Sequence, residues 1–412
     1  MKVKIWKVLG LLSIVIFMLS IAGSVHAASL TTTITTGVTP VGVVYDPVMH
    51  EIFVCNYVGG DIQVISDSTN QQVADITALT QYAGPPYNMA YDSGKGEIWV
   101  ADATGAYAIS DATNQVVANV TDTNGLDLAV FDPKTGEVFM SYNGVIAVIS
   151  DTTNTIISSL TQSVTSIVDD SAKSEIFAAQ NTGGQGSSSI YVISANTNAV
   201  TNTVPVSGTP DYLVYDSGKG EIFVGGSVFD SKQGTTNSIV QIISDSTNKV
   251  VATINLPTTV NLGAMAYNPN KGEIYMNDGA SVAIISDKTN DVVGTVNTNG
   301  YASSSDGIAY DSGTSTVYAI NNPGSTSGSM GSLAVVSDPS SGTSTPGPTS
   351  VASSSPSTSA SPTSSAATSP SPTVPEFSNA TLLLVGAALV IGTLCTVGLA
   401  ARKSTRTRSF SK

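Results

Sequence analysis

Short apolar stretches separated by turn-forming residues recur along most of the chain. The clearest copy runs from Met89 to Val120, where flat apolar or β-branched segments alternate with turns. Asp92 to Gly96 is typical of a first turn and Ser110 to Asn114 of a second, because Gly, Asn and Asp tolerate positive φ or bond their own backbone. The segments between them are rich in residues that favour strands. The pattern therefore predicts a unit of four consecutive short strands.

The unit occurs seven times, and its first turn carries the most regular markers. An Asp ends the first apolar segment of each copy, replaced once by Asn268, at spacings of 46, 40, 38, 46, 52 and 43 residues. A Glu follows five residues later in six copies, and Thr316 takes its place in the last. The repeated acids are Asp46, Asp92, Asp132, Asp170, Asp216 and Asp311, followed by Glu51, Glu97, Glu137, Glu175, Glu221 and Glu273. A four-strand unit with this period is typical of a β-propeller blade.

The two ends of the repeat array predict how the ring closes. The last unit stops after its third strand, at Val336 to Asp338, so one outer strand is missing there. The segment from Leu30 to Thr36 has the form of an outer strand without a unit of its own. We expect it to complete the seventh blade, because an open ring would leave two unpaired sheet edges. The expected fold is all-β, a seven-bladed β-propeller over residues 28–338 closed by an N-terminal outer strand.

The flanking segments predict export and membrane attachment. Residues 1–27 have a basic start, a short apolar run and a small-x-small site ending at Ala27, which is typical of a cleaved signal peptide; a retained N-terminal anchor is the alternative. Residues 339–374 are almost wholly Ser, Thr, Pro, Ala and Gly, which predicts a disordered stalk suited to O-glycosylation. Within residues 375–412, an uncharged run at 380–401 predicts one transmembrane helix, and the basic tail after it is expected to be cytoplasmic. The propeller is therefore expected on the extracellular face of the cell membrane.

Charge and composition exclude several classes of function. Of 16 basic and 30 acidic residues in the chain, eight lysines, no arginine and 29 acids fall within residues 28–338. Phosphate contacts need Lys and Arg, so no nucleic-acid partner is expected. Only His50 remains after signal cleavage, and Cys55 and Cys395 cannot plausibly meet, which excludes a His-based triad and a Cys/His metal cluster. No cofactor is predicted; a carboxylate-only Ca²⁺ site stays open, although no Asp-x-Asp-x-Asp-Gly loop is present.

The loops divide into two kinds. The first and third turns of each unit are nearly constant and are expected on one face of the ring. The second loops and the crossovers to the next unit vary and are expected on the opposite face: Thr77–Tyr87, Gln180–Ser189, Gly225–Ser238 and Asn321–Gly331. Insertions gathered on one face often mark the binding face of a repeat protein. A cell-surface glycan or protein ligand is expected there, with drift in loops that have no role as the alternative. Asn119 begins an Asn-x-Thr sequon and is a candidate N-glycosylation site.

Two parts of the chain resemble known families. The blades, with the elements Phe53 to Asn56 and Ile65 to Asn70, resemble the YVTN-type β-propeller repeats of archaeal surface-layer proteins over residues 29–338. Pro375, Glu376 and Phe377, followed by an apolar helix and a basic tail, resemble the PEF-type sorting signal read by archaeosortases. In that family the helix is removed and the protein is fixed to a lipid. The resemblances imply an archaeal cell-surface protein, attached by the helix or by a lipid, with an archaeosortase as processing partner.

Two hypotheses of function follow. The first is a non-catalytic surface protein for coat, adhesion or ligand capture, in which the repeated carboxylates are architecture because nearly every blade carries them. The second is a propeller hydrolase or lyase with a divalent cation in the central channel. Three or more Asp, Asn or Glu side chains converging at the channel mouth would favour the second. A mouth lined by small and apolar residues would favour the first.

Overall fold

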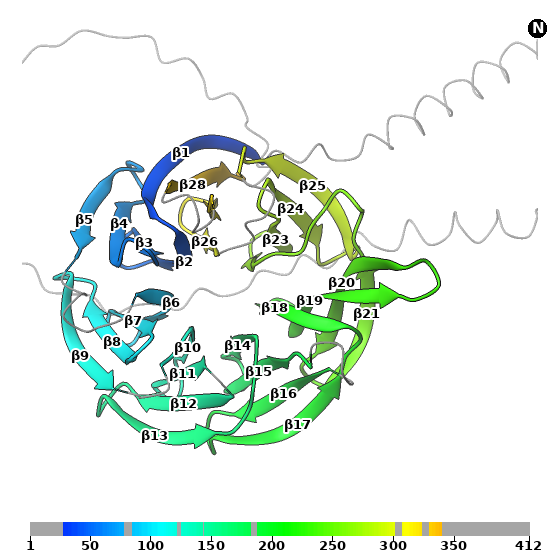
Figure 1. Cartoon of the computed structure of the whole chain (residues 1–412), viewed down its shortest axis with the longest axis horizontal. Helices are drawn as coiled ribbons and strands as arrows, with labels where there is room; N and C mark the ends of the chain where they lie inside the picture. Colours follow the sequence, from blue (N-terminus) through cyan, green and yellow to red (C-terminus); the bar gives the residue numbers. More distant parts are fainter. Residues whose placement is uncertain are drawn as a thin grey trace, which may run out of the picture. The chain divides into compact units, whose positions relative to one another are not determined.

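The computed structural model describes residues 28–77, 85–121, 125–142, 144–182, 188–300, 307–323 and 329–339. These residues form seven four-stranded antiparallel sheets, arranged as blades around a central channel (Figure 1). In this described part of the chain, no helix is long and apolar enough to cross a membrane. The expected signal peptide, stalk and C-terminal helix lie outside the described residues.

Each blade is a meander that runs from the channel to the rim. Blade 1 contains β2 (Pro40–Asp46), β3 (Glu51–Asn56), β4 (Asp61–Ser66) and β5 (Gln72–Ile76). Blade 2 contains β6 (Pro86–Asp92), β7 (Glu97–Asp102), β8 (Gly105–Ser110) and β9 (Gln115–Thr121). Blade 3 contains β10 (Leu128–Asp132), β11 (Glu137–Tyr142), β12 (Val145–Ser150) and β13 (Thr155–Leu160). Blade 4 contains β14 (Ser166–Asp170), β15 (Glu175–Gln180), β16 (Ser189–Ser194) and β17 (Ala199–Pro205).

The remaining blades complete the ring. Blade 5 contains β18 (Thr209–Asp216), β19 (Glu221–Asp230), β20 (Thr235–Ser244) and β21 (Lys249–Asn255). Blade 6 contains β22 (Met265–Asn268), β23 (Glu273–Asn277), β24 (Ser281–Ser286) and β25 (Asp291–Asn297). Blade 7 contains β26 (Ile308–Asp311), β27 (Thr316–Asn321), β28 (Met330–Ser337) and, outermost, β1 (Ser29–Val38). β1 is antiparallel to β28, with Ser29 opposite Ser337, so the predicted closure by an N-terminal outer strand is confirmed.

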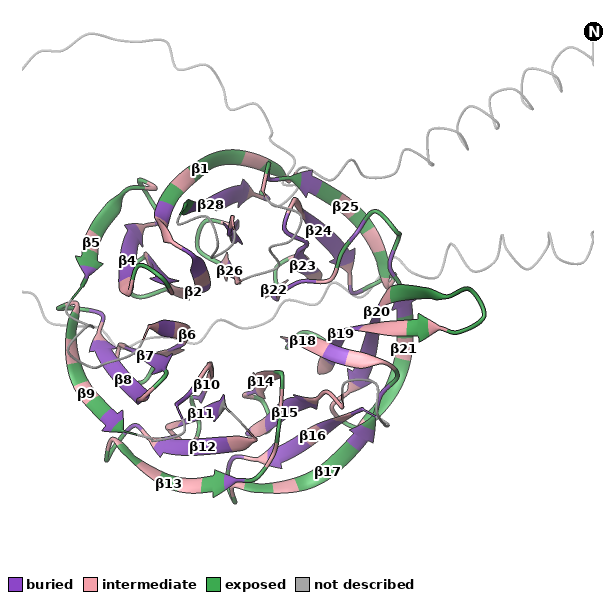
Figure 2. Cartoon of the chain, viewed as in Figure 1, coloured by how far each residue is buried: buried purple, intermediate pink, exposed green. Residues whose placement is uncertain are grey.

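The hydrophobic core is divided among the seven junctions between blades. Each junction has its own cluster, and each cluster contains the aromatic residue of the second strand of one blade, packed against the next blade. These aromatics are almost wholly buried: Phe53, Trp99, Phe139, Phe177, Phe223, Tyr275 and Tyr318. Figure 2 shows the result, buried middle strands and exposed outer strands. Burial of seven aromatics between blades favours a closed ring, since removing any blade would expose two clusters.

The turns recur with the same backbone conformation. The Asn of the second turn is left-handed in six blades, with φ of 51–57°, as the sequence predicts: Asn70, Asn114, Asn154, Asn198, Asn248 and Asn290. The first turn ends on another left-handed residue, which is Gly in four blades. The carbonyl of that residue accepts the backbone N–H that opens the second turn, as from Asp111 to Gly96 at 3.0 Å. The two turns of each blade are thus joined at one face of the ring.

Each outer strand carries a bulge at the same place. One residue is skipped in the pairing with the third strand in every blade: Thr31, Val73, Val117, Ile157, Thr201, Val251 and Val293. The aliphatic members are 42–54% exposed. The two threonines turn their hydroxyls back to third-strand carbonyls, Thr31 to Val335 at 2.7 Å and Thr201 to Val192 at 3.1 Å. Bulges of this kind twist a strand and make its free edge a poor template for another chain.

Candidate functional site at the channel mouth

A cavity of about 300 Å³ lies where the seven inner strands begin. One residue from each blade lines it at the same repeat position, four before the turn Asp or Asn: Gly42, Asn88, Leu128, Ser166, Tyr212, Ala264 and Gly307. This cavity is the mouth of the channel. It opens on the face that carries the second loops, because β3 and its equivalents run antiparallel to the inner strands and end there.

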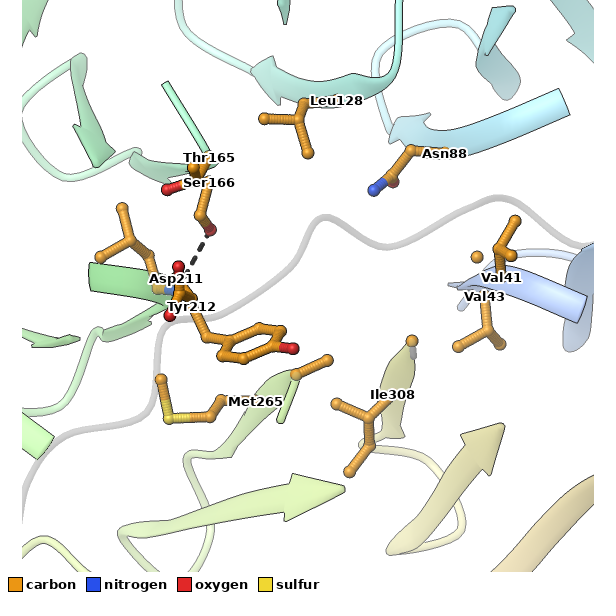
Figure 3. Close-up of a pocket in the computed structure, with 14 residues that line it drawn as sticks. Val41, Val43, Asn88, Leu128, Thr165, Ser166, Asp211, Tyr212, Met265 and Ile308 are labelled. Carbon is orange, nitrogen blue, oxygen red and sulfur yellow. Dashed lines mark hydrogen bonds between the residues drawn. The ribbon is translucent and has the colours of Figure 1, made fainter. Parts of the chain in front are cut away.

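Three inner strands carry a bulge at their first residues. The bulged residues are Val41, Tyr87 and Asp211, which are skipped in the pairing with the second strand. Asp211 lines the mouth together with its neighbour Tyr212, as Val41 does with Gly42, whereas the bulged Tyr87 does not line it. In Figure 3 the Tyr212 ring reaches into the cavity from this wall, and Asn88 points inward from the other side.

The polar side of the mouth is held by hydrogen bonds between blades 4 and 5. Thr165 Oγ1 donates to the carbonyl of Pro210 at 2.8 Å, and Ser166 Oγ accepts from the N–H of Leu213 at 3.2 Å. Asn181 Nδ2 donates to Asp211 Oδ1 at 2.9 Å. Burial raises the pKa of Asp211, and the hydrogen bond from Asn181 partly offsets that rise. The carboxylate is therefore held on one oxygen at the edge of the cavity.

The rest of the mouth is apolar or small. Val41, Val43, Leu128, Met265 and Ile308 are its larger apolar residues. Gly42 permits the close approach of blade 2, since a Cβ there would lie 3.2 Å from the carbonyl oxygen of Tyr87. Cys55 is buried in the cluster between blades 1 and 2. The lining thus combines small and apolar residues with one amide, Asn88, and one carboxylate, Asp211.

Buried polar residues shape the second loops around the mouth. Asp102 Oδ1 accepts the N–H of Thr104 at 2.6 Å, and Asp278 Oδ1 accepts that of Ser281 at 2.6 Å. Asn56 Nδ2 donates to Asp61 Oδ2 at 2.8 Å. Asn56, Asp102 and Asp278 each stand three residues after the buried aromatic of the second strand, at the start of the second loop. The side chains of Asn56, Asp102 and Asp278 form hydrogen bonds that close these loops.

The variable loops are described only in part. Thr77–Tyr87, Gln180–Ser189 and Asn321–Gly331 each extend beyond the described residues. Gly225–Ser238 is described in full and forms the end of a long hairpin, β19–β20, which projects beyond the ring in Figure 1. Phe229 near its tip is 65% exposed.

The predicted turn acids lie at the far end of the inner strands from the mouth. Asp211 and Asp216 mark the two ends of β18, and five residues of extended strand span roughly 16 Å. The turn aspartates are fully buried, and their Oδ1 atoms accept backbone N–H groups, as Asp216 does from Gly218 at 2.9 Å and Lys219 at 3.1 Å. Each turn Glu starts the second strand directly opposite its Asp, as Glu221 faces Asp216. The structure does not bring these acids to the mouth.

The same acids join neighbouring blades. At four junctions a second-turn Asp of the next blade comes close to the turn Asp, as Asp245 does to Asp170. An inner-strand Tyr completes several junctions, and Tyr215 and Tyr267 hydrogen-bond Asp170 and Asp216. Five of the eight propeller lysines reach across these junctions. Lys173 forms an ion pair with Asp245 at 2.9 Å, and Lys271 with Asp338. Lys95, Lys134 and Lys219 donate to backbone carbonyls of the next blade.

Junction 3/4 departs from this pattern in two compensating ways. Its second-turn acid is replaced by Ala195, and the inner-strand Tyr is replaced by Asp169. Burial, then the nearby carboxylates of Asp132 and Asp170, raise the pKa of Asp169 to about 8. An acid pair thus persists at this junction, with Asp169 of the inner strand β14 taking the place of a second-turn acid.

The other predicted site residues fall outside the mouth. His50 Nδ1 lies 3.1 Å from Asp67 Oδ2, within the joined turns of blade 1. Asn119 is exposed on the outer strand β9. Ala27, Pro375, Glu376 and Phe377 lie outside the described residues. Among the residues that the structure describes, no group of three or more His, Cys, Asp or Glu is arranged to hold a metal ion.

Sequence reasoning missed Asn88, Asp211 and Tyr212. The sequence does contain a sign of the mouth. At the two repeat positions four and five residues before the turn Asp, the residue type changes from blade to blade, while the turns stay constant. Period-two alternation places the first of these positions on the channel side of each inner strand. The bulge at Asp211 breaks the alternation, and the sequence does not mark it.

Comparison with known proteins identifies the fold but no family. No family model matches the chain, and no curated protein matches it. Among solved structures, the chain is similar to the Kuenenia stuttgartiensis hydrazine synthase, with a TM-score of 0.58 and 13% identity, over 72% of this chain and 95% of that one. At this identity the likeness shows the β-propeller fold alone.

Proposed function

We propose that the chain is a non-catalytic binding protein of the cell surface, of the YVTN surface-layer type, which captures a ligand at the channel mouth. The observation that carries this proposal is the lining of the mouth, to which every blade contributes and which is mostly small or apolar. A concave apolar site with a few convergent polar groups is typical of a ligand pocket.

The placement of the repeated carboxylates supports the same proposal. They lie at the opposite end of the inner strands and are engaged in turns and blade junctions. A channel hydrolase or lyase would need carboxylates directed to one point where a substrate could sit. The cation-dependent enzyme remains the second candidate, and the test below separates the two.

Binding without turnover is the expected behaviour. The purified protein is applied to glycan and peptide arrays, and each ligand that binds is then incubated with it in the presence and absence of Ca²⁺ and Mg²⁺. Mass spectrometry should find every bound ligand unchanged. Cation-dependent cleavage or elimination of a bound ligand would replace this proposal by the hydrolase or lyase.

The location proposed is the extracellular face of the membrane. The support is the sequence before and after the propeller, with a signal ending at Ala27 and the Pro375-Glu376-Phe377 motif before an apolar run. If an archaeosortase processes the motif, the mature protein should end near Phe377 and carry a lipid. Intact mass of the protein from native membranes decides this. Recovery of Ser404 to Lys412 on most molecules would instead indicate a retained helix.

A further inference from the structure

We propose that the channel mouth binds a primary alkylammonium group, as in a lysine side chain or a free alkylamine, with Asp211 as its counter-charge. This inference rests on the proposed binding function and gives it a ligand class. The same repeat position holds Asp127 and Asp306 in blades 3 and 7 and Val41 and Thr165 in blades 1 and 4. Of its two acids that the structure describes, Asp127 and Asp211, only Asp211 lines the cavity.

The charge of the mouth end favours a cation. The described acids there include Asp61, Asp102, Asp127, Asp211 and Asp278. Five of the propeller lysines are engaged at the opposite face. At that face Lys288 lies in a second turn and Lys249 begins β21 just after one, while Lys232 lies at the tip of the β19–β20 hairpin. No described Lys or Arg lines the cavity. The field at the mouth therefore attracts cations and repels anions.

The walls favour an apolar stem behind that cation. Met265, Ile308 and Val43 offer aliphatic surface for methylene groups, and the Tyr212 ring reaches into the cavity beside Asp211 (Figure 3). An ammonium group over an aromatic face gains a cation–π contribution. The cavity of about 300 Å³ is at the lower end of the size range of small-ligand sites, which suits a single unbranched chain.

A hydrogen bond holds the anchor in place. Asp211 and Tyr212 both line the cavity, and Asn181 holds one oxygen of the Asp211 carboxylate at 2.9 Å. The carboxylate is thus oriented before a ligand arrives, which lowers the entropy cost of binding.

The test titrates the full chain, kept in a mild non-ionic detergent, with n-butylammonium and with n-butanol by isothermal titration calorimetry. The two probes share an apolar stem and differ in charge. We expect the amine to bind at least about tenfold more tightly, since hydrogen bonds to charged groups are the stronger ones. Equal affinities would overturn the proposal, and this comparison needs no variant.

Two variants test whether the preference for the amine depends on the Asp211 carboxylate. Asp211→Asn keeps the acceptor for Asn181 and should weaken amine binding by about tenfold or more. Asp127→Asn removes the same charge one residue before Leu128, outside the cavity lining, and should change affinity by less than about threefold. Equal effects of the two variants, with both melting like the parent chain, would mean that only the general field acts, and the proposal would be wrong.

Further measurements distinguish a protein-borne ammonium group from a free amine. They also distinguish failure of the ammonium inference from failure of the proposed binding function. A peptide acetyl-Gly-Lys-Gly-amide that binds more tightly than n-butylammonium indicates a protein partner, and the reverse indicates a free amine. If neither binds while a glycan from the array does, the ammonium inference fails and the binding function stands. If a bound amine is chemically converted, the binding function itself fails.

Discussion

At the residue scale, the first turn of each blade ends on a residue with left-handed backbone, and in most blades the second-turn Asp packs against that residue. Gly96 has a φ of 67°, and a Cβ added to it would lie 2.5 Å from Asp111 Oδ2. Blade 4 has Ser174 at the glycine position and Ala195 in place of the acid. Blades 1 and 7 keep the acid, Asp67 and Asp338, beside His50 and Ser315 at the glycine position, so both pairings occur within one chain.

We expect Gly96→Ala to destabilise the propeller by more than Gly234→Ala. Gly234 has the same φ of 67° but no atom within 4 Å of an added Cβ, so its variant measures backbone strain alone, about 1–2 kcal/mol. Chemical denaturation of both variants gives the difference. The double variant Gly96→Ala with Asp111→Ala should return the loss to the Gly234→Ala value. Similar losses for the two single variants would show that Asp111 moves aside at no cost.

At the element scale, the bulged outer strands account for most of the exposed β-branched residues. Val117 and Thr201 occupy the same bulge in blades 2 and 4, and only the threonine can return a hydrogen bond to the third strand. The sequence shows these positions as part of the strand pattern. It does not mark the skipped residue, because a bulge shifts pairing without changing residue type.

Exchanging the two bulge residues should shift stability in opposite directions. Thr201→Val removes the bond to the Val192 carbonyl and should cost about 0.5–1.5 kcal/mol, while Val117→Thr should be neutral or stabilising. Thermal unfolding of both variants provides the comparison. A loss of the same size from Val117→Thr would mean that β-branched packing, and not the hydroxyl, sets the stability of the bulge.

Deletion of β1 addresses the closure itself. Removal of residues 28–38 should uncover the β28 edge along Leu333 to Val336 and cause a marked drop in melting temperature or aggregation. Light scattering during a thermal melt measures both. Deleting the tip of the β19–β20 hairpin is the matched control, since it removes strand residues that lie beyond the blade body. A β1 deletion that melts like this control would contradict closure by the N-terminal strand.

Much of the fold could be predicted from the sequence, and the mouth could not. The seven units, their turns and the pairing of the first and last strands all follow from the period of apolar and turn residues. The mouth depends on which inner-strand residues face the axis and on a bulge at Asp211. Those features arise from the packing of seven strands far apart in the chain, and local pattern does not record them.

At the scale of the whole molecule, the acids at the blade junctions make stability depend on pH in an unusual direction. Burial raises the pKa of many of them, including Glu97, Glu137, Glu175, Glu221 and Asp169. Because the pKa values of these acids are higher in the folded state, the folded state binds more protons than the unfolded chain in this pH range. Its stability therefore falls as the pH rises between the unfolded pKa near 4 and the raised values.

We accordingly expect a higher melting temperature at pH 5 than at pH 8. Asp169, with a pKa of about 8, should carry part of this slope. Asp169→Asn should raise the melting temperature at pH 8 and flatten the profile, and Asp230→Asn in the exposed hairpin turn is the control. A parent chain that is most stable at pH 8 would contradict the upward pKa shifts.

The position of β28 has a mechanical consequence. The described chain ends just after this strand, which is hydrogen-bonded on both sides, to β27 and to β1. Any pull transmitted through the residues beyond 339 is therefore borne first by a strand with two ladders, one of which ties it to a residue 304 positions away, as Thr31 is tied to Val335. An outermost strand in that place would have peeled from its blade one pair at a time. Here such a load would be shared between the first and the last strand of the propeller, β1 and β28.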